Sequence, residues 1–179
     1  AGEAPLKGIK VVDLTQGLCG PYTSLLMADG GAEVIKVEPT DGDYAREFMP
    51  QHSSGVSVVF AALNRNKRSI SLDLASKIGR LALEELVKSA DVMLVDWTPS
   101  VEGELNLDWD RLRKLNPRLI YCSISPFGEN GPWKGLSGAE LVLQAAAGVH
   151  NFVGIRGEQP VRMGADIANV STSLVTFQA

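Results

Sequence analysis

Ile9-Lys10-Val11-Val12-Asp13-Leu14 and Ala32-Glu33-Val34-Ile35-Lys36-Val37 are two short runs rich in β-branched and apolar residues near the start of the chain. Their apolar residues are nearly continuous, which is typical of strands buried on both faces of a parallel sheet. Between them, Pro21 stands where a helix would begin and Gly30-Gly31 stands where it would end. This stretch predicts a strand–helix–strand unit with a crossover helix.

The same alternation continues along the rest of the chain. Polar and apolar residues alternate at 69–74, which predicts a half-buried strand, and further strands are expected at 91–95 and 119–124. The predicted helices cover 55–63, 76–89, 108–115 and 137–147. The helix at 76–89 is the clearest, because apolar residues recur at helical spacing at Ile78, Leu81, Ala82, Leu86 and Val87. The sequence therefore predicts an α/β fold, an open parallel sheet with flanking helices.

Composition limits what the protein can be. The length of 179 residues fits one domain over 1–179. The 17 Lys and Arg against 21 Asp and Glu give a net charge of −4, which disfavours a general nucleic-acid-binding protein. No run approaches the roughly 20 apolar residues of a membrane span, and no apolar signal-peptide core precedes the first strand. Two distant cysteines and two histidines argue against a metal site, so we expect a soluble cytoplasmic protein without bound metal.

The turn after the first predicted strand, 13–21, contains two glycines but no nucleotide-binding motif. Both Gly-x-Gly-x-x-Gly and the Gly-Lys-Ser/Thr of a P-loop are absent, so nicotinamide dinucleotides and ATP are poor candidates as ligands. A strand–helix turn that needs small residues is the plainer interpretation. Neither His52 nor His150 lies in a recognisable nucleophile motif, which argues against a triad hydrolase.

Three charged segments carry candidate chemistry. Arg65-Asn66-Lys67-Arg68 gathers cations that suit phosphate oxygens, and it also suits an ordinary solvated turn. Glu140 lies inside an apolar helical stretch. Asp166 follows Gly164-Ala165 at the start of a terminal helical segment. A carboxylate there can cap the helix, act as an accessible nucleophile, or do both.

An ordered series of short motifs gives the chain a resemblance to a known family. The series is Asp13-Leu14-Thr15, Cys19-Gly20-Pro21-Tyr22, the run from Gly31 to Pro39, Gly42-Asp43, the run from Asn64 to Ile70, Leu72-Asp73-Leu74, the run from Asn116 to Tyr121, Phe127-Gly128 and Gly131-Pro132. In this order, and over nearly the whole chain, the motifs resemble the family III CoA-transferases. That group includes formyl-CoA transferase, carnitine CoA-transferase and α-methylacyl-CoA racemase. Because family members are longer, the resemblance implies that 1–179 is the N-terminal part of their Rossmann-like, large CoA-binding domain.

The resemblance also implies roles for individual residues. Asp166 matches the nucleophile whose attack on an acyl-CoA thioester gives a mixed anhydride, and Glu140 would assist near the thioester. The implied CoA-binding residues fall into three groups by the part of CoA that they would meet. Gln16, Leu18 and Cys19 would lie near the pantetheine thiol, Leu72 and Ala75 near the adenine, and Lys36, Arg65, Lys67 and Arg68 beside the ADP phosphates.

The implied partners are an acyl-CoA, which brings CoA as a substrate, and a carboxylate acceptor. The resemblance implies no bound metal and no binding to nucleic acid or to a membrane. Family members form interlocked homodimers, so a homodimer is expected when the rest of the polypeptide is present. Two residues depart from the family pattern: Ala165 replaces a common Gly, and Ala139 replaces the acid/base His of a racemase. CoA transfer through an aspartyl anhydride and an aspartyl-CoA is therefore favoured. An acyl-CoA racemase, a transferase-lyase variant and a non-catalytic CoA-binding module remain as alternatives.

Overall fold

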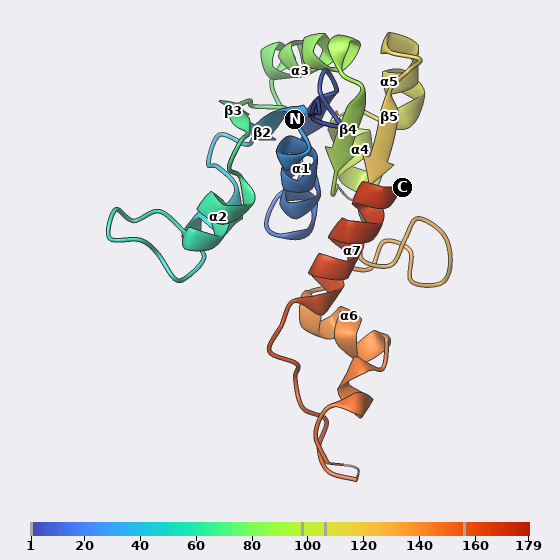
Figure 1. Ribbon diagram of the computed structural model, residues 1–179. Coiled ribbons are helices and arrows are strands. Elements are labelled where there is room, and N and C mark those ends of the chain that lie inside the picture. The colour runs from blue at the N-terminus through green and yellow to red at the C-terminus, as the bar shows by residue number, and fades with distance from the viewer. Residues whose placement is uncertain (1, 98, 106, 156) are drawn as a thin grey trace.

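Five parallel strands pair in the order β3-β2-β1-β4-β5 in a computed structural model that describes residues 2–97, 99–105, 107–155 and 157–179. The strands are β1 (Lys10–Asp13), β2 (Glu33–Glu38), β3 (Arg68–Ser71), β4 (Val92–Val95) and β5 (Ile120–Ser123). The helices are α1 (Cys19–Asp29), α2 (Val58–Leu63), α3 (Lys77–Ser89), α4 (Pro99–Leu105), α5 (Trp109–Leu115), α6 (Glu140–Ala146) and α7 (Ile167–Gln178), with 3-10 turns η1 (Tyr44–Glu47) and η2 (Val149–Phe152). The chain steps outward from β1 to β3 and then crosses to β4 and β5 (Figure 1). This confirms the predicted α/β class and its open, Rossmann-like parallel sheet.

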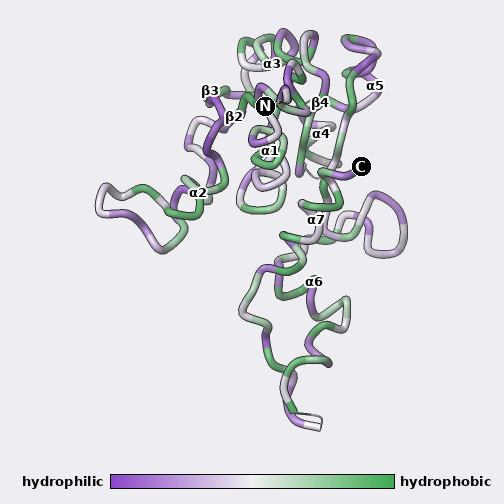
Figure 2. The backbone as a smooth tube through the Cα atoms, in the orientation of Figure 1, coloured by the Kyte–Doolittle hydropathy of each residue, from purple (hydrophilic) through white to green (hydrophobic). Residues whose placement is uncertain are grey.

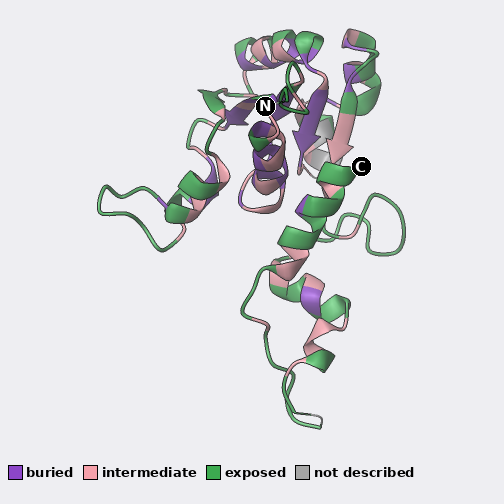
Figure 3. Cartoon of the chain, viewed as in Figure 1, coloured by how far each residue is buried: buried purple, intermediate pink, exposed green. Residues whose placement is uncertain are grey.

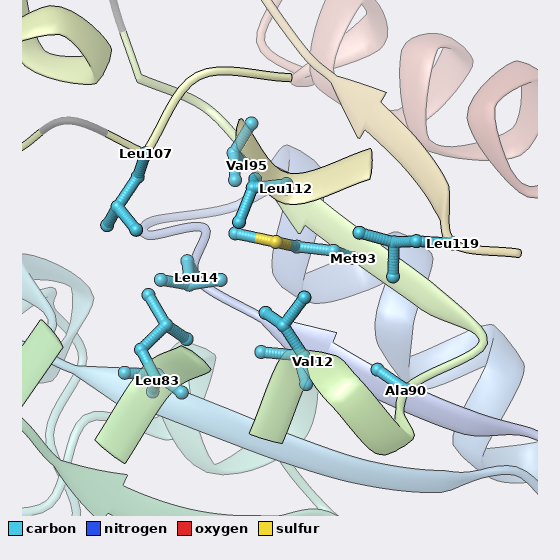
Figure 4. Packing of buried hydrophobic residues seen from close by; sticks show 11 residues of the cluster. Val12, Leu14, Leu83, Ala90, Met93, Val95, Leu107, Leu112 and Leu119 are labelled. Atoms are coloured by element: carbon cyan, nitrogen blue, oxygen red, sulfur yellow. The ribbon is translucent and has the colours of Figure 1, made fainter. Parts of the chain in front are cut away.

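Helices cover both faces of the sheet. On one face β1 and β4 pack against α3 and α5, where Leu83, Met93 and Leu112 are fully buried (Figure 4). On the other face Leu94 of β4 packs with Ala28 of α1. The central strands are accordingly the buried ones in Figure 3. Burial on both faces is the physical reason for the nearly continuous apolar runs in the sequence.

The strand predicted at 69–74 is shorter than expected, and the predicted half-burial does not hold within it. It is present as β3, but all four of its side chains are exposed. β3 lies at the edge of the sheet and pairs with β2 alone. Leu72 and Leu74, just beyond the end of β3, are partly buried and pack against the core, so the alternating burial is found after the strand rather than within it.

The buried face of the helix at 76–89 is also not the one that the spacing of Ile78 and Leu81 predicts. The helix is present as α3, but Ile78 is 81% exposed and Leu81 is exposed as well. Its buried stripe contains Gly79, Leu83 and Val87, which follow one another at i, i+4 and i+8. A Cβ at Gly79 would collide with the carbonyl of Asp73. The glycine therefore lets the start of α3 lie against the loop at Asp73, and the apolar residues of α3 that are fully buried in the core are Leu83 and Val87.

Two segments extend away from the sheet in Figure 1: the one around α2, and α6 with the chain that leads to α7. Most of their residues are exposed (Figure 3), although α6 and α7 are rich in hydrophobic residues (Figure 2). The helices predicted at 55–63 and 137–147 are present over the shorter spans of α2 and α6, and no sequence pattern indicates α4. Within the described ranges, no helix has the length and apolar character needed to cross a membrane.

Candidate functional site

Thr15, Gln16 and Gly17 form the turn that leads from β1 to α1, called the β1 turn below. Its three consecutive N–H groups donate to three carboxylates: Thr15 to Asp13 Oδ1 at 3.0 Å, Gln16 to Asp96 Oδ2 at 2.8 Å, and Gly17 to Asp43 Oδ1 at 3.0 Å. The Thr15 carbonyl accepts from Lys36 Nζ at 2.8 Å. Since the protein's own carboxylates engage these N–H groups, the β1 turn is rigidly held and is not a phosphate cradle.

Two buried lysines neutralise carboxylates beneath the β1 turn. Lys36 Nζ lies 2.8 Å from Asp43 Oδ2, and these side chains are 1% and 0% exposed. Within the described residues this oxygen receives no well-directed hydrogen bond, so attraction between opposite charges holds the contact. Lys67 Nζ lies 3.3 Å from Asp13 Oδ2 and donates to the Pro21 carbonyl at 2.8 Å. Both ammonium groups are therefore buried beneath the β1 turn, where they contact carboxylates and backbone carbonyls.

The pKa values of these groups shift in different directions. Burial by itself would raise the pKa of Asp13, but Lys67, Lys36 and two hydroxyl donors hold it below its ordinary value. Burial lowers the pKa of Lys67 to about 8, against the opposing effect of Asp13. Burial raises the pKa of Asp96 to about 6, and the negative charge of Asp13 adds to the rise. Asp96 therefore changes its charge near neutral pH, whereas Asp13 stays ionised.

The two arginines of the 65–68 segment lie at the surface. Arg65 pairs with Asp29 at the end of α1, and Arg68 Nη2 lies 3.9 Å from Glu33 Oε2. The segment therefore does not present its cations together, because Lys67 points inward while both arginines pair with surface carboxylates. Binding of CoA phosphates by these residues and by Lys36 stays a prediction.

Asp166 lies at the N-cap position of α7, as its sequence context predicts, but its side chain forms no capping hydrogen bond. Glu140 of α6 takes that role from another element. Its Oε1 accepts from the N–H of Ala168 at 2.7 Å and its Oε2 from the N–H of Asn169 at 2.8 Å. These donors, with the Gln144 amide, hold the pKa of Glu140 below its ordinary value although burial acts in the opposite direction. The cap supplied by Glu140 leaves the exposed carboxylate of Asp166 free for other chemistry.

Helix α7 is fastened to α1 by buried hydroxyl groups. Ser173 Oγ donates to the Cys19 carbonyl at 2.8 Å, and Thr23 Oγ1 donates to the Ser173 carbonyl at 3.3 Å. Both hydroxyl-bearing residues are fully buried. This contact brings the start of α7 to the β1 turn, across about 150 residues of sequence.

Two hollows lie at the carboxyl ends of the strands, and a third lies next to them between α1, α2 and α7. The first, about 260 Å³, is lined by residues that include Leu14, Gln16, Leu72, Asp73, Ala75 and Trp97. The second, about 210 Å³, shares Gln16 with the first and is lined also by Leu18, Cys19, Tyr44, Asp96 and Asn169. The third, about 270 Å³, shares Leu18 and Asn169 with the second and includes Asp166. The shared residues make the three hollows neighbours, and this series of hollows is called the path below; Asp166 lines its third member.

The structure thus brings together six of the eleven residues singled out from the sequence. Gln16, Leu18, Cys19, Leu72, Ala75 and Asp166 line the path. Glu140 lies behind it as the cap of α7, and the four cations Lys36, Arg65, Lys67 and Arg68 line none of the three hollows.

The sequence analysis missed Asp96 and Asn169, which line the middle of the path. Asp96 directly follows β4, and ligands of parallel sheets bind beyond the carboxyl ends of strands, so its position was an available signal. Asn169 had no such signal, because only the packing of α7 on α1 brings it there. Among the described residues, no group of three or more His, Cys, Asp or Glu side chains is arranged to hold a metal ion.

Comparison with known proteins gives consistent relatives. The chain is 37% identical over 184 residues to a succinate–glutarate CoA-transferase of Agrobacterium fabrum, and the alignment covers 99% of this chain and 46% of that protein. It is 37% identical over 169 residues to a formyl-CoA:oxalate CoA-transferase of Streptomyces coelicolor, covering 94% of this chain and 41% of that protein. The crystal structure of a CAIB/BAIF family protein from Brucella suis matches with a TM-score of 0.93 and 35% identity, over 99% of this chain and 48% of that chain.

The chain therefore spans less than half the length of each of these relatives. The description of CoA-transferase family III matches residues 6–179, nearly the whole sequence. The fold, the ordered motifs and the relatives agree, and the chain belongs to CoA-transferase family III.

Proposed function

We propose that this chain is the CoA-binding and nucleophile-bearing part of an enzyme that transfers CoA between an acyl-CoA and a carboxylic acid. The observation that carries the proposal is the series of three neighbouring hollows, of which the third is lined by the uncapped carboxylate of Asp166. CoA is a long molecule with a nucleotide at one end and a reactive thiol at the other. A path with a single accessible carboxylate at one end suits such a ligand.

In this proposal the nucleotide of CoA occupies the first hollow, beside Leu72 and Ala75. The pantetheine arm follows the second hollow past Gln16, Leu18 and Cys19, and the thioester reaches Asp166. Arg80 stabilises the loop at Leu74 and Ala75, because its Nη1 donates to the carbonyls of these residues at 3.0 and 2.7 Å. Arg80 therefore supplies positive charge near the first hollow, where none of the four cations predicted from the sequence lies.

The chemistry proceeds by nucleophilic catalysis. The Asp166 carboxylate attacks the thioester carbonyl, the C–S bond breaks, and CoA leaves as the thiolate from a mixed anhydride. The thiolate then attacks the aspartyl carbonyl, which releases the first acid as its carboxylate and leaves an aspartyl-CoA thioester. The acceptor carboxylate attacks this thioester, the C–S bond breaks, and a second mixed anhydride forms as CoA leaves as the thiolate. The thiolate then attacks the acyl carbon of the acceptor, and the Asp166 carboxylate leaves. Asp166 is regenerated, and no proton is gained or lost over the cycle.

Glu140 has a positioning role in this proposal, rather than the direct role near the thioester that the resemblance implies. Both of its oxygens accept N–H groups of α7, so they are engaged before any substrate arrives. A carboxylate fixed in this way defines where α7 begins. It thereby defines where the Asp166 carboxylate points.

The interlocked homodimer and the cytoplasmic location stay proposals of the family resemblance. The arm formed by α6 and α7 supports the first, because it exposes apolar side chains that a longer polypeptide or a second copy would cover. These are Leu141, Val142, Phe152, Ile155, Val170, Leu174 and Val175.

The test is substitution of Asp166 by Asn and by Ser in the native polypeptide that contains this sequence. Exchange of CoA is measured with succinyl-CoA and glutarate and with formyl-CoA and oxalate, and the enzyme–acyl adduct is trapped with hydroxylamine. Both variants are expected to lose at least about 10³-fold in rate, together with the adduct. Asp41→Asn, at an exposed aspartate outside the hollows, is the matched control.

Unchanged exchange in either Asp166 variant would refute the nucleophilic mechanism. If the unsubstituted polypeptide binds CoA but exchanges no acyl group with any acceptor, the non-catalytic module is the correct function instead.

A further inference from the structure

Gln144 is an unusual residue for its surroundings. It is 2% exposed, whereas Leu141 and Val142 of the same short helix are exposed, so α6 buries a polar amide and leaves apolar side chains outside. Burying an amide is costly unless it forms hydrogen bonds. The partners of Gln144 therefore show what its position requires.

The Gln144 amide contacts the turn that presents Asp166. Its Nε2 donates to the Ala165 carbonyl at 3.0 Å and to Glu140 Oε1 at 2.7 Å. Both partners are acceptors, so the amide can only have its NH₂ group on this side. Ala165 directly precedes Asp166 in the chain.

Glu140 and Gln144 lie at i and i+4, on one face of α6. Gln144 holds the peptide before Asp166, and Glu140 holds the N–H groups of Ala168 and Asn169 after it. We propose that Gln144 is a positioning residue for Asp166, acting with Glu140 as a clamp on the turn at 165–169. This inference rests on the proposed function, in which Asp166 is the nucleophile.

A second feature of Gln144 separates this role from a stabilising one. Its Oε1 is buried and has no hydrogen-bond partner among the described residues. A buried acceptor without a partner is unfavourable, and an apolar side chain of similar shape removes it. Gln144→Met removes this unpaired acceptor together with the two N–H hydrogen bonds, so the two effects on stability offset each other and the melting temperature is expected to change little while the peptide before Asp166 is released.

The experiment compares Gln144→Met with the unsubstituted native polypeptide, with succinyl-CoA as donor and glutarate as acceptor. We expect kcat and the rate of hydroxylamine-trapped adduct formation to fall about 10- to 100-fold, because small displacements of a reacting group have effects of this size. KM for the acyl-CoA is expected to change less than about twofold, since Gln144 lines none of the three hollows. Gln51→Met, at an exposed glutamine, is the matched control.

Gln144→Leu is the second variant, in case Gln144→Met does not fold. It also has no N–H donor, and it places no second ionisable group beside Glu140, so kcat is expected to fall by a similar factor. Normal kcat in either folded variant overturns the inference, and so does a loss of kcat that only follows a fall in melting temperature. If Asp166→Asn retains exchange, the proposed function itself fails; if Asp166 is essential and Gln144→Met is fully active, only the positioning role fails.

Discussion

Two turns meet at the candidate site, and they are held by different means. The β1 turn sits on buried charges: three carboxylates accept its N–H groups and Lys36 binds its carbonyl. The turn at 165–169 is held by two side chains of α6, in an arm that is mostly exposed. The β1 turn is thus held by groups buried in the protein interior, whereas the turn at 165–169 is held by two side chains of a single short helix.

The difference predicts how each turn responds to mutation. Changes beneath the β1 turn leave a buried charge without its partner, so they should affect the stability of the whole protein. Changes in the clamp should affect the position of Asp166 more than global stability. The predictions below test this contrast.

Lys36→Met should give the largest effect. It leaves the fully buried Asp43 carboxylate without its counter-charge and the Thr15 carbonyl without its donor. The free energy of unfolding should fall by about 3–5 kcal/mol, as measured by urea titration. Lys7→Met is the control, because Lys7 pairs with Glu3 at the surface and should cost less than about 1 kcal/mol. An equal loss of unfolding free energy in Lys36→Met and Lys7→Met would show that the buried charges beneath the β1 turn are not important for stability.

Asp96→Asn tests the pH dependence of the β1 turn. The pKa of Asp96 is raised to about 6 in the folded protein, above its unfolded value, so the folded state holds the proton more tightly. Stability from this group is present at low pH and is lost as the pH rises to about 6 and beyond. The variant still offers an oxygen to the Gln16 N–H but carries no charge. At pH 7.5 it should be more stable than the unsubstituted protein, by at most about 3 kcal/mol.

The measurement is the unfolding midpoint between pH 4 and pH 8. The unsubstituted protein should lose stability across pH 4 to 6 relative to Asp96→Asn. Parallel pH profiles would show that Asp96 does not titrate in this range.

Glu140→Ala removes the cap of α7 and should cost about 1–2 kcal/mol of stability. Glu140→Gln should cost less, because one amide oxygen can still accept an N–H group. Asp108→Ala is the matched control, since Asp108 caps α5 far from Asp166 and accepts from the Arg111 N–H at 2.9 Å. The two Ala variants should lose similar stability, but only Glu140→Ala should slow CoA exchange. Equal exchange rates in the two variants would argue against the clamp.

Ser173→Ala should give the smallest effect, about 1 kcal/mol, because it removes one buried hydrogen bond between α7 and α1. Thermal unfolding measures the change, with the exposed Ser171→Ala as control. A cost above that of Glu140→Ala would mean that the helix contact, and not the clamp, is the main support of the second turn.

The residues that line the hollows were predicted from the family resemblance, and the sheet topology explains why they lie together. Leu72 and Ala75 follow β3, and Gln16 follows β1, so the sheet topology places them at the same edge. For the 65–68 segment the pattern shows only that charges are close in sequence. Lys67 directly precedes β3 and its side chain enters the interior, whereas Arg68, the first residue of the strand, stays outside.

The sequence by itself determined the order of strands and helices, the parallel sheet and the family, because apolar periodicity, turn residues and motif order are local properties. Tertiary structure alone decided what Asp166 is free to do. Its position in the sequence suits a cap and a nucleophile equally well. Glu140, a side chain from another helix, accepts the N–H groups of α7, so Asp166 does not cap the helix and its carboxylate is available for the role proposed above. Long-range packing is what brings these groups together, and spacing along the chain does not encode it.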